Sequence, residues 1–298
     1  MTYTQPANHH SRRSFLKAVG GLGSLALAPW PRALGAESQV KDLLVLIPGI
    51  TGSVLQKNNK DVWAVTRESV GGALASLGRN LDTLALKDDP QDVEDLGDGV
   101  VATALFLDVH LIPGFSKIDG YSGVKAALSQ RLNLDGAKNY IEFPYDWRRD
   151  NRVAARRLAR LVPAWLDQWK KASGNADAKV VFIAHSMGGL VVKKAYLLGK
   201  QDAQFSSIIS KVHGIMFLAT PHRGAQHATT LNNILSSTPL GPPPKGYVHD
   251  LQLQSYALQD INEQFRHYCQ GLLLVSFFET YKTNFGVTKS IVSRGILV

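Results

Sequence analysis

The chain has 298 residues, 45% of them hydrophobic and 19% charged, which is enough for one sizeable globular domain with its own core. Its formal charge of +9 includes four basic residues in 1–36, a segment without acids, so the remaining 29 basic residues face 24 acidic ones and leave +5. This small excess of positive charge is compatible with binding to an anionic membrane surface. Since no RNA- or DNA-binding motif is present, we expect no nucleic-acid partner. Cys269 is the only cysteine, which excludes an internal disulfide and a cysteine-based metal site.

The first 36 residues have the features of an export signal. Residues 11–17 (SRRSFLK) fit the twin-arginine signal at every position, and the apolar segment at 18–28 is too short to span a bilayer. A small-residue site follows at 33–36 (ALGA). We therefore predict a bacterial protein that the twin-arginine route exports to the periplasm or the extracellular space, with a signal peptide at 1–36.

The mature part opens with a strand and a glycine-rich turn. Residues 43–47 (LLVLI) form a continuous apolar run, which is typical of a buried strand. The turn that follows, 48–53 (PGITGS), can supply a backbone N–H for a developing oxyanion, and Ile50 is the candidate donor. Residues 56–125 are less regular, and we predict that much of this segment forms a cap or lid inserted over the site.

The middle of the chain predicts a helix at 124–132, a short strand at 140–143 and a long helix at 150–171. The long helix carries its apolar side chains on one face. Its arginines are expected to form a solvated face rather than a binding patch: Arg152, Arg156, Arg157 and Arg160.

The stretch 180–198 has the pattern of a nucleophile elbow. The apolar run at 180–183 predicts a buried strand, the apolar positions of 190–198 recur at helical spacing, and the turn AHSMG at 184–188 joins the two. Such a turn exposes the hydroxyl of the Ser at its apex and requires small residues two positions before and after it. We predict that Ser186 is the nucleophile and that the N–H of Met187 faces the oxyanion.

Further strands are predicted at 212–219 and 271–278, with a helix at 251–268 between them. Strands that alternate with helices along the chain indicate the α/β class, with a doubly wound, mostly parallel sheet.

Two resemblances, both to families of the α/β-hydrolase superfamily, rest on these motifs. Residues 43–190 resemble the bacterial relatives of lecithin:cholesterol acyltransferase in IPGITGS at 47–53, FPYDWR at 143–148 and the elbow. From about residue 180 to 298 the chain resembles serine-active-site lipase-like proteins of the SERAC type, in FLATPHRG at 217–224, DINEQF at 260–265 and SFFET at 276–280. The resemblances imply an α/β-hydrolase domain over 37–298, with the cap at 56–125, and acyl-ester chemistry on lipids.

The triad of this fold follows the order Ser, acid, His, which makes Glu279, at the end of the strand 271–278, the predicted catalytic acid. None of the nine histidines follows Glu279. The resemblance places the catalytic His in a loop after one further strand, so we expect a chain that is truncated at its C-terminus. His222, at the end of the strand 212–219, is the fallback base, although the resemblance favours a structural role for it.

The sequence thus predicts a serine esterase, lipase or acyltransferase that acts on carboxylic esters of lipids and requires no cofactor and no metal. The expected partner is a lipid or ester substrate, the charge is compatible with membrane-surface contact, and no oligomeric state is predicted. The alternative, suggested by the missing His, is a catalytically impaired α/β-hydrolase remnant that at most binds lipid or protein.

Overall fold

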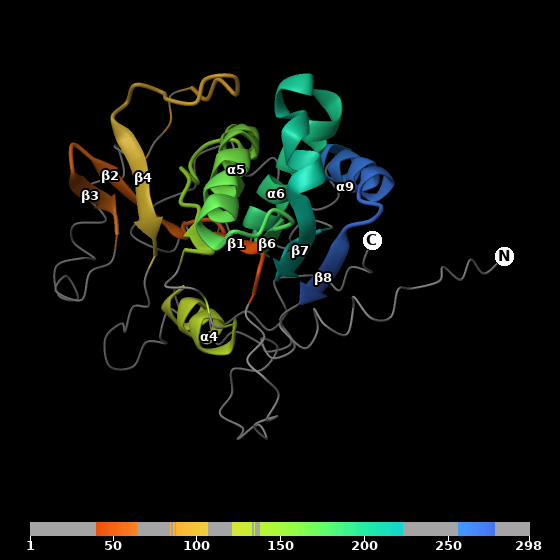
Figure 1. The fold of residues 1–298 in the computed structure, drawn as a ribbon. Helices are drawn as coiled ribbons and strands as arrows, with labels where there is room; N and C mark the ends of the chain where they lie inside the picture. Colours follow the sequence, from red (N-terminus) through yellow and green to blue (C-terminus); the bar gives the residue numbers. More distant parts are fainter. Residues whose placement is uncertain are drawn as a thin grey trace, which may run out of the picture.

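A parallel sheet of five strands forms the centre of the protein. The computed structural model describes residues 40–64, 84, 86, 88–106, 121–132, 134, 138–222 and 256–277. Within these ranges the strand order is β5-β1-β6-β7-β8, and every neighbouring pair is parallel (Figure 1). The strands are β1 (Leu43–Ile47), β5 (Tyr140–Glu142), β6 (Val180–His185), β7 (Val212–Leu218) and β8 (Leu273–Phe277). The predicted mostly parallel α/β sheet is confirmed.

Both faces of this sheet are covered, which explains the unbroken apolar runs of its strands. Because side chains alternate along a strand, Val45 packs in the core cluster on the side of α5 and α6, whereas Leu44 and Leu46 pack in a second cluster with α4. Figure 1 shows α4 on the side of the sheet opposite α5. The helices are α4 (Ser122–Leu132), α5 (Asn151–Ser173), α6 (Gly188–Gln201) and α9 (Tyr256–Tyr268), with a 3₁₀ helix η2 at Ala203–Lys211.

Helix α5 has clear start and stop signals. The Asp150 side chain accepts a hydrogen bond from the Arg152 N–H at 2.7 Å, and the helix ends at Gly174, whose φ of 68° suits a residue without Cβ. The indole N–H of Trp169, near the helix end, donates to the Lys41 carbonyl at 2.8 Å. This contact ties the end of α5 to the chain that enters β1. None of the helices in the described part of the chain is both long and apolar enough for a membrane crossing.

A smaller antiparallel sheet begins just before the segment 56–125, which we expect to form the cap, and includes part of that segment. It consists of β2 (Ser53–Lys57), β3 (Lys60–Trp63) and β4 (Val100–Leu105), in the order β3-β2-β4. Its first residue, Ser53, attaches it to the chain after β5, because Ser53 Oγ accepts from the Tyr145 N–H and the Ser53 carbonyl accepts from the indole of Trp147. The rest of the predicted cap, at 65–83 and 107–120, lies outside the described residues, as do the predicted signal peptide and Glu279.

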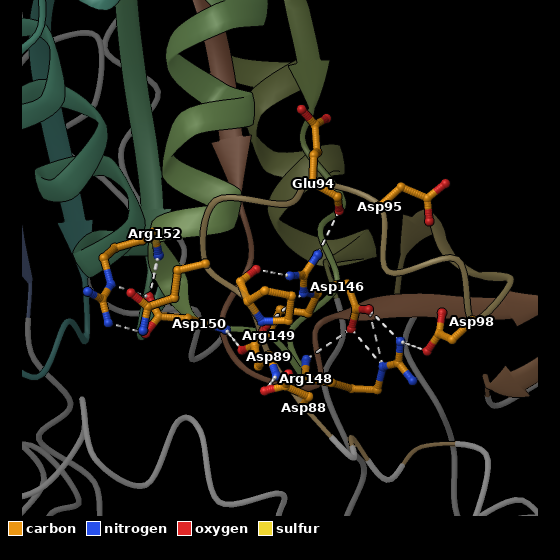
Figure 2. A network of polar contacts seen from close by, with 12 residues as sticks. Asp88, Asp89, Glu94, Asp95, Asp98, Asp146, Arg148, Arg149, Asp150 and Arg152 are labelled. Carbon is orange, nitrogen blue, oxygen red and sulfur yellow. Dashed lines mark hydrogen bonds and ion pairs between the residues drawn. The ribbon is translucent and has the colours of Figure 1, made fainter.

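An arginine pair holds the acidic segment 88–98 against the start of α5 (Figure 2). Arg148 is fully buried and forms ion pairs with Asp146 at 2.6 Å and with Asp98 at 2.9 Å. Burial acts to lower the pKa of this guanidinium, but its hydrogen bonds and charge contacts with the two carboxylates outweigh burial and raise it. Arg149 binds Asp89 at 2.9 Å and two backbone carbonyls of the same segment. The segment is therefore held by buried charges.

The expectation of a solvated arginine face on α5 is confirmed in part: the side chains of Arg152 and Arg160 are 49% and 53% exposed, but three of the four arginines also bind other segments. Arg156 donates to the Gln91 carbonyl, Arg160 pairs with Glu94 at 2.7 Å, and Arg157 donates to the Pro144 carbonyl at 2.9 Å. Helical periodicity showed that these arginines face away from the core, but it could not show that a segment about 60 positions earlier in the chain folds back over them.

Candidate active site

The predicted elbow lies between β6 and α6, with Ser186 as the first residue after the strand. Its φ of 48° falls in the left-handed region, which residues other than glycine seldom adopt. The Ser186 N–H donates to the Leu218 carbonyl of the neighbouring strand β7 at 2.7 Å, which holds the turn in place. A Ser held in this conformation between a strand and a helix has the backbone geometry of a nucleophile elbow.

Glycines at the start of α6 allow the helix to approach the end of β1. A Cβ at residue 188 would lie 2.5 Å from the Pro48 carbonyl oxygen and 2.7 Å from that of Ile47. At Gly189 a Cβ would collide with the side chain of Thr220. From the sequence, we expect a small residue at 188 because the strand and the helix that flank the Ser lie close together. In the structure, the atoms that exclude a larger residue belong to β1 and the turn after it.

The turn after β1 packs directly against Ser186, the predicted nucleophile. It closes through a hydrogen bond from the Gly52 N–H to the Gly49 carbonyl at 3.1 Å, and Thr51 has a positive φ of 59°. A Cβ at Gly49 would lie 2.9 Å from the Cβ of Ser186, so only glycine fits there. The structure therefore brings together the two segments that the sequence places about 135 positions apart.

Both predicted oxyanion donors belong to these two segments. The N–H groups of Ile50 and Met187 make no hydrogen bond within the part of the chain that the structure describes. Met187 also precedes the first residue of α6, where the helix dipole favours negative charge. The geometry is compatible with two N–H groups that stabilise an oxyanion formed on an acyl group attached to Ser186.

A tyrosine that the sequence analysis did not identify links the same two segments. Tyr121 Oη accepts a hydrogen bond from the Gly49 N–H at 2.7 Å and lies 2.7 Å from Nδ1 of His185. Burial lowers the pKa of His185 to about 4, so the imidazole is neutral at pH 7. Tyr121 is 72 and 64 positions from its two partners, and no local pattern marks it.

The fallback base His222 lies in a buried polar cluster. Its Nδ1 is 2.8 Å from Nζ of Lys193, and its Nε2 is 3.4 Å from Oγ of Ser276. Asn262 donates to the His222 carbonyl and accepts from Lys193 at 2.7 Å. No hydrogen bond joins His222 to Ser186 among the residues described. Its role as a base remains a prediction.

Burial perturbs both ionisable groups of this cluster. It lowers the pKa of Lys193 to about 7, and burial together with the neighbouring Lys193 lowers the pKa of His222 to about 3. His222 is thus neutral at pH 7 and can accept from the lysine. In the sequence, the position of Lys193 among the apolar residues of the helix after the elbow was the feature from which this cluster could have been predicted.

β8 is the second strand after β6 in the sheet, and it ends at Phe277, two residues before Glu279. A pocket of about 260 Å³ lies elsewhere, between β4 and α5, and its lining includes Glu94, Tyr145 and Arg157 but no residue of the elbow. Among the described residues, no group of three or more His, Cys, Asp or Glu side chains could hold a metal ion.

The parallel sheet, the helices on both of its faces and a strained Ser between β6 and α6 define an α/β-hydrolase. The sequence model of the family "lecithin:cholesterol acyltransferase" matches residues 115–239. Protein SERAC1 of Danio rerio is 35% identical over 121 residues, and that of Homo sapiens is 31% identical over the same length. Each alignment covers 39% of this chain and 17% of the relative, so the similarity spans about one sixth of the curated relatives' length.

Two solved structures are similar at lower identity. Phospholipase PlaB from Legionella pneumophila has a TM-score of 0.40 and 15% identity, and the match covers 79% of this chain and 38% of that one. The Bacillus licheniformis lipase BlEst2 has a TM-score of 0.35 and 14% identity, and the match covers 89% of this chain and 74% of that one.

Both predicted resemblances are confirmed, but the acyltransferase similarity has other bounds than expected: the model begins at residue 115 and so leaves out the motif at 47–53. The acyltransferase model reaches residue 239 and so includes the segment at 217–224 that we assigned to the SERAC type alone. At the level of families, this chain is similar to lecithin:cholesterol acyltransferase over residues 115–239.

Proposed function

We propose that the chain is a serine hydrolase or acyltransferase that acts on carboxylic esters of lipids, with Ser186 as its nucleophile. The observation that carries the proposal is the left-handed φ of Ser186 at the junction of β6 and α6, with the turn after β1 packed against it. Backbone strain of this kind is concentrated at functional sites. The similarity to the lecithin:cholesterol acyltransferase family supports a lipid ester as the substrate class.

In the proposed reaction, Ser186 Oγ attacks the acyl carbon of the ester, and the carbonyl oxygen becomes an oxyanion. The N–H groups of Ile50 and Met187 stabilise that charge, each acting as a preorganised donor. A histidine base takes the hydroxyl proton and returns it to the leaving alcohol, while Glu279 orients this base. Water or a second alcohol then accepts the acyl group, which gives hydrolysis or acyl transfer. His222 remains the candidate base for variants to test.

We also propose that residues 1–36 direct export by the twin-arginine route. The complete SRRSFLK pattern at 11–17 supports this localisation. A site outside the cytoplasm, together with the mild positive charge of the remaining chain, is compatible with access to lipid at a membrane surface.

A fluorophosphonate probe tests the nucleophile, because labelling requires an activated serine hydroxyl. We expect the parent chain to label and to hydrolyse p-nitrophenyl esters, and Ser186→Ala to do neither while keeping the circular dichroism spectrum of the parent. Ser206→Ala, which removes an exposed hydroxyl from η2, is the matched control and should label normally. Equal labelling of Ser186→Ala and the parent would refute the assignment. A folded parent that does not label would support the impaired remnant instead.

A further inference from the structure

We infer that Tyr121 is the residue that positions the oxyanion turn against the nucleophile, an inference that rests on the proposed function of Ser186. The oxyanion turn is defined as residues 48–52, which include the candidate donor Ile50. Tyr121 Oη lies between a backbone group of this turn and the residue before the nucleophile, 2.7 Å from each. It is a positioning residue, because it makes no contact with the reacting atoms.

The directions of the two hydrogen bonds follow from the groups involved. The Gly49 N–H can only donate, so Tyr121 Oη accepts there and keeps its own proton. That proton is then available for Nδ1 of His185, which accepts it when the imidazole is neutral. In this arrangement the neutral imidazole carries its own proton on Nε2. The Tyr121 hydroxyl thus makes one hydrogen bond with the turn after β1 and one with the last residue of β6, and it connects these two strand ends.

The tyrosine is itself anchored to the same turn. The Phe106 N–H donates to the Gly52 carbonyl at 2.8 Å, and the Tyr121 N–H donates to the Phe106 carbonyl at 3.0 Å. Together with the bond from Gly49 to Tyr121 Oη, these bonds close a ring that begins and ends in the oxyanion turn. A frame of this kind holds the tyrosine and the turn as one unit.

The packing around the hydroxyl is close enough to transmit a displacement. A Cβ at Gly52 would lie 2.9 Å from Tyr121 Oη, and a Cβ at Gly49 would lie 3.2 Å from Nδ1 of His185. The ring of Tyr121 meets the imidazole edge to face, with centroids 5.6 Å apart. Removal of the hydroxyl leaves the Gly49 N–H without its partner and frees the turn to move away from Ser186.

The consequence for catalysis is a loss in rate rather than in binding. Oxyanion stabilisation depends on a donor that is already in place when the charge develops, and a displacement of about 1 Å can cost roughly 100-fold. Substrate binding does not use this donor to the same extent, since the oxyanion exists only in the transition state. We therefore expect Tyr121→Phe to lower kcat about 10- to 100-fold and to change KM by less than about threefold.

The experiment compares the full chain with Tyr121→Phe and with Tyr196→Phe. The control removes the same hydroxyl from α6, where it donates to the Tyr268 carbonyl at 3.4 Å, and should keep parental activity. Fluorophosphonate labelling rates, kcat and KM for p-nitrophenyl butyrate, and melting curves are measured on all three. A second measurement, amide hydrogen exchange of residues 48–52, should show faster exchange at Gly49 in Tyr121→Phe alone.

The outcomes separate this inference from the proposed function. Loss of kcat with faster exchange at Gly49 supports the inference. Labelling and exchange at parental rates in Tyr121→Phe, while Ser186→Ala abolishes labelling, overturn it and leave the nucleophile standing. A parent that does not label overturns the proposed function, and the exchange at Gly49 then decides by itself whether Tyr121 holds the turn.

Discussion

Replacement of Gly188 by alanine tests whether the elbow depends on the close approach of α6 to the end of β1. The added Cβ would lie 2.5 Å and 2.7 Å from two backbone carbonyl oxygens, those of Pro48 and Ile47. A close carbon–oxygen contact is about 3.3 Å, so the helix would have to move by roughly 0.6 to 0.8 Å. Rotation of a side chain cannot relieve this overlap, because both neighbours are backbone atoms at the end of a buried strand.

The expected cost follows from this displacement. Overpacking of a closely packed interior costs about 1–3 kcal/mol, and a shift of catalytic groups by about 1 Å can slow a reaction roughly 100-fold. We expect Gly188→Ala to lower the free energy of unfolding by about 2 kcal/mol. Urea unfolding measures this loss. The rate of fluorophosphonate labelling should fall roughly 100-fold, because Met187 and Ser186 move with the helix.

Gly123→Ala is the matched control, since no atom lies within 4 Å of a Cβ built at this position of α4. It should keep the parental labelling rate and be neutral or stabilising by up to about 1 kcal/mol. A Gly188→Ala variant with parental stability and labelling would refute the packing argument. A destabilised variant that still labels at the parental rate would refute the link between the position of α6 and reactivity.

Three further predictions concern stability and export. Arg148→Met should lower the free energy of unfolding by about 1.5–3 kcal/mol, because the partly buried carboxylates of Asp98 and Asp146 lose their fully buried partner; a loss below about 1 kcal/mol in urea unfolding would contradict this. The hydrogen bond to Asp42 raises the pKa of His213 above 6.5. The contribution of this pair to the free energy of unfolding is therefore complete below pH 6.5, and it is lost as pH rises through the folded-state pKa. Asp42→Asn should flatten that part of the stability profile, and an unchanged profile would argue against the pair. Replacement of Arg12 and Arg13 by lysine should leave the protein in the cytoplasm, as cell fractionation would show.

Much of the fold could be predicted because its signals are local. The apolar runs of β1, β6 and β7 and the periodicity of α5 and α6 reflect burial on one or both faces, and burial is recorded in the residues themselves. The elbow could be predicted for the same reason, since the strand, the Ser and the glycine after it are consecutive.

Contacts between segments that are distant in the sequence were decided only by the tertiary structure. The acidic segment 88–98 binds the arginines of α5, Tyr121 joins the turn after β1 to the elbow, and Lys193 binds His222. Each contact pairs groups at least 29 positions apart, and the residue types alone fit a solvent-exposed role as well as a buried one. Hydrogen bonds and ion pairs depend on distance and direction in space, which the sequence encodes only through the whole fold. The sequence by itself therefore determined which element carries the proposed nucleophile, and the tertiary structure decided which residues hold that element in place.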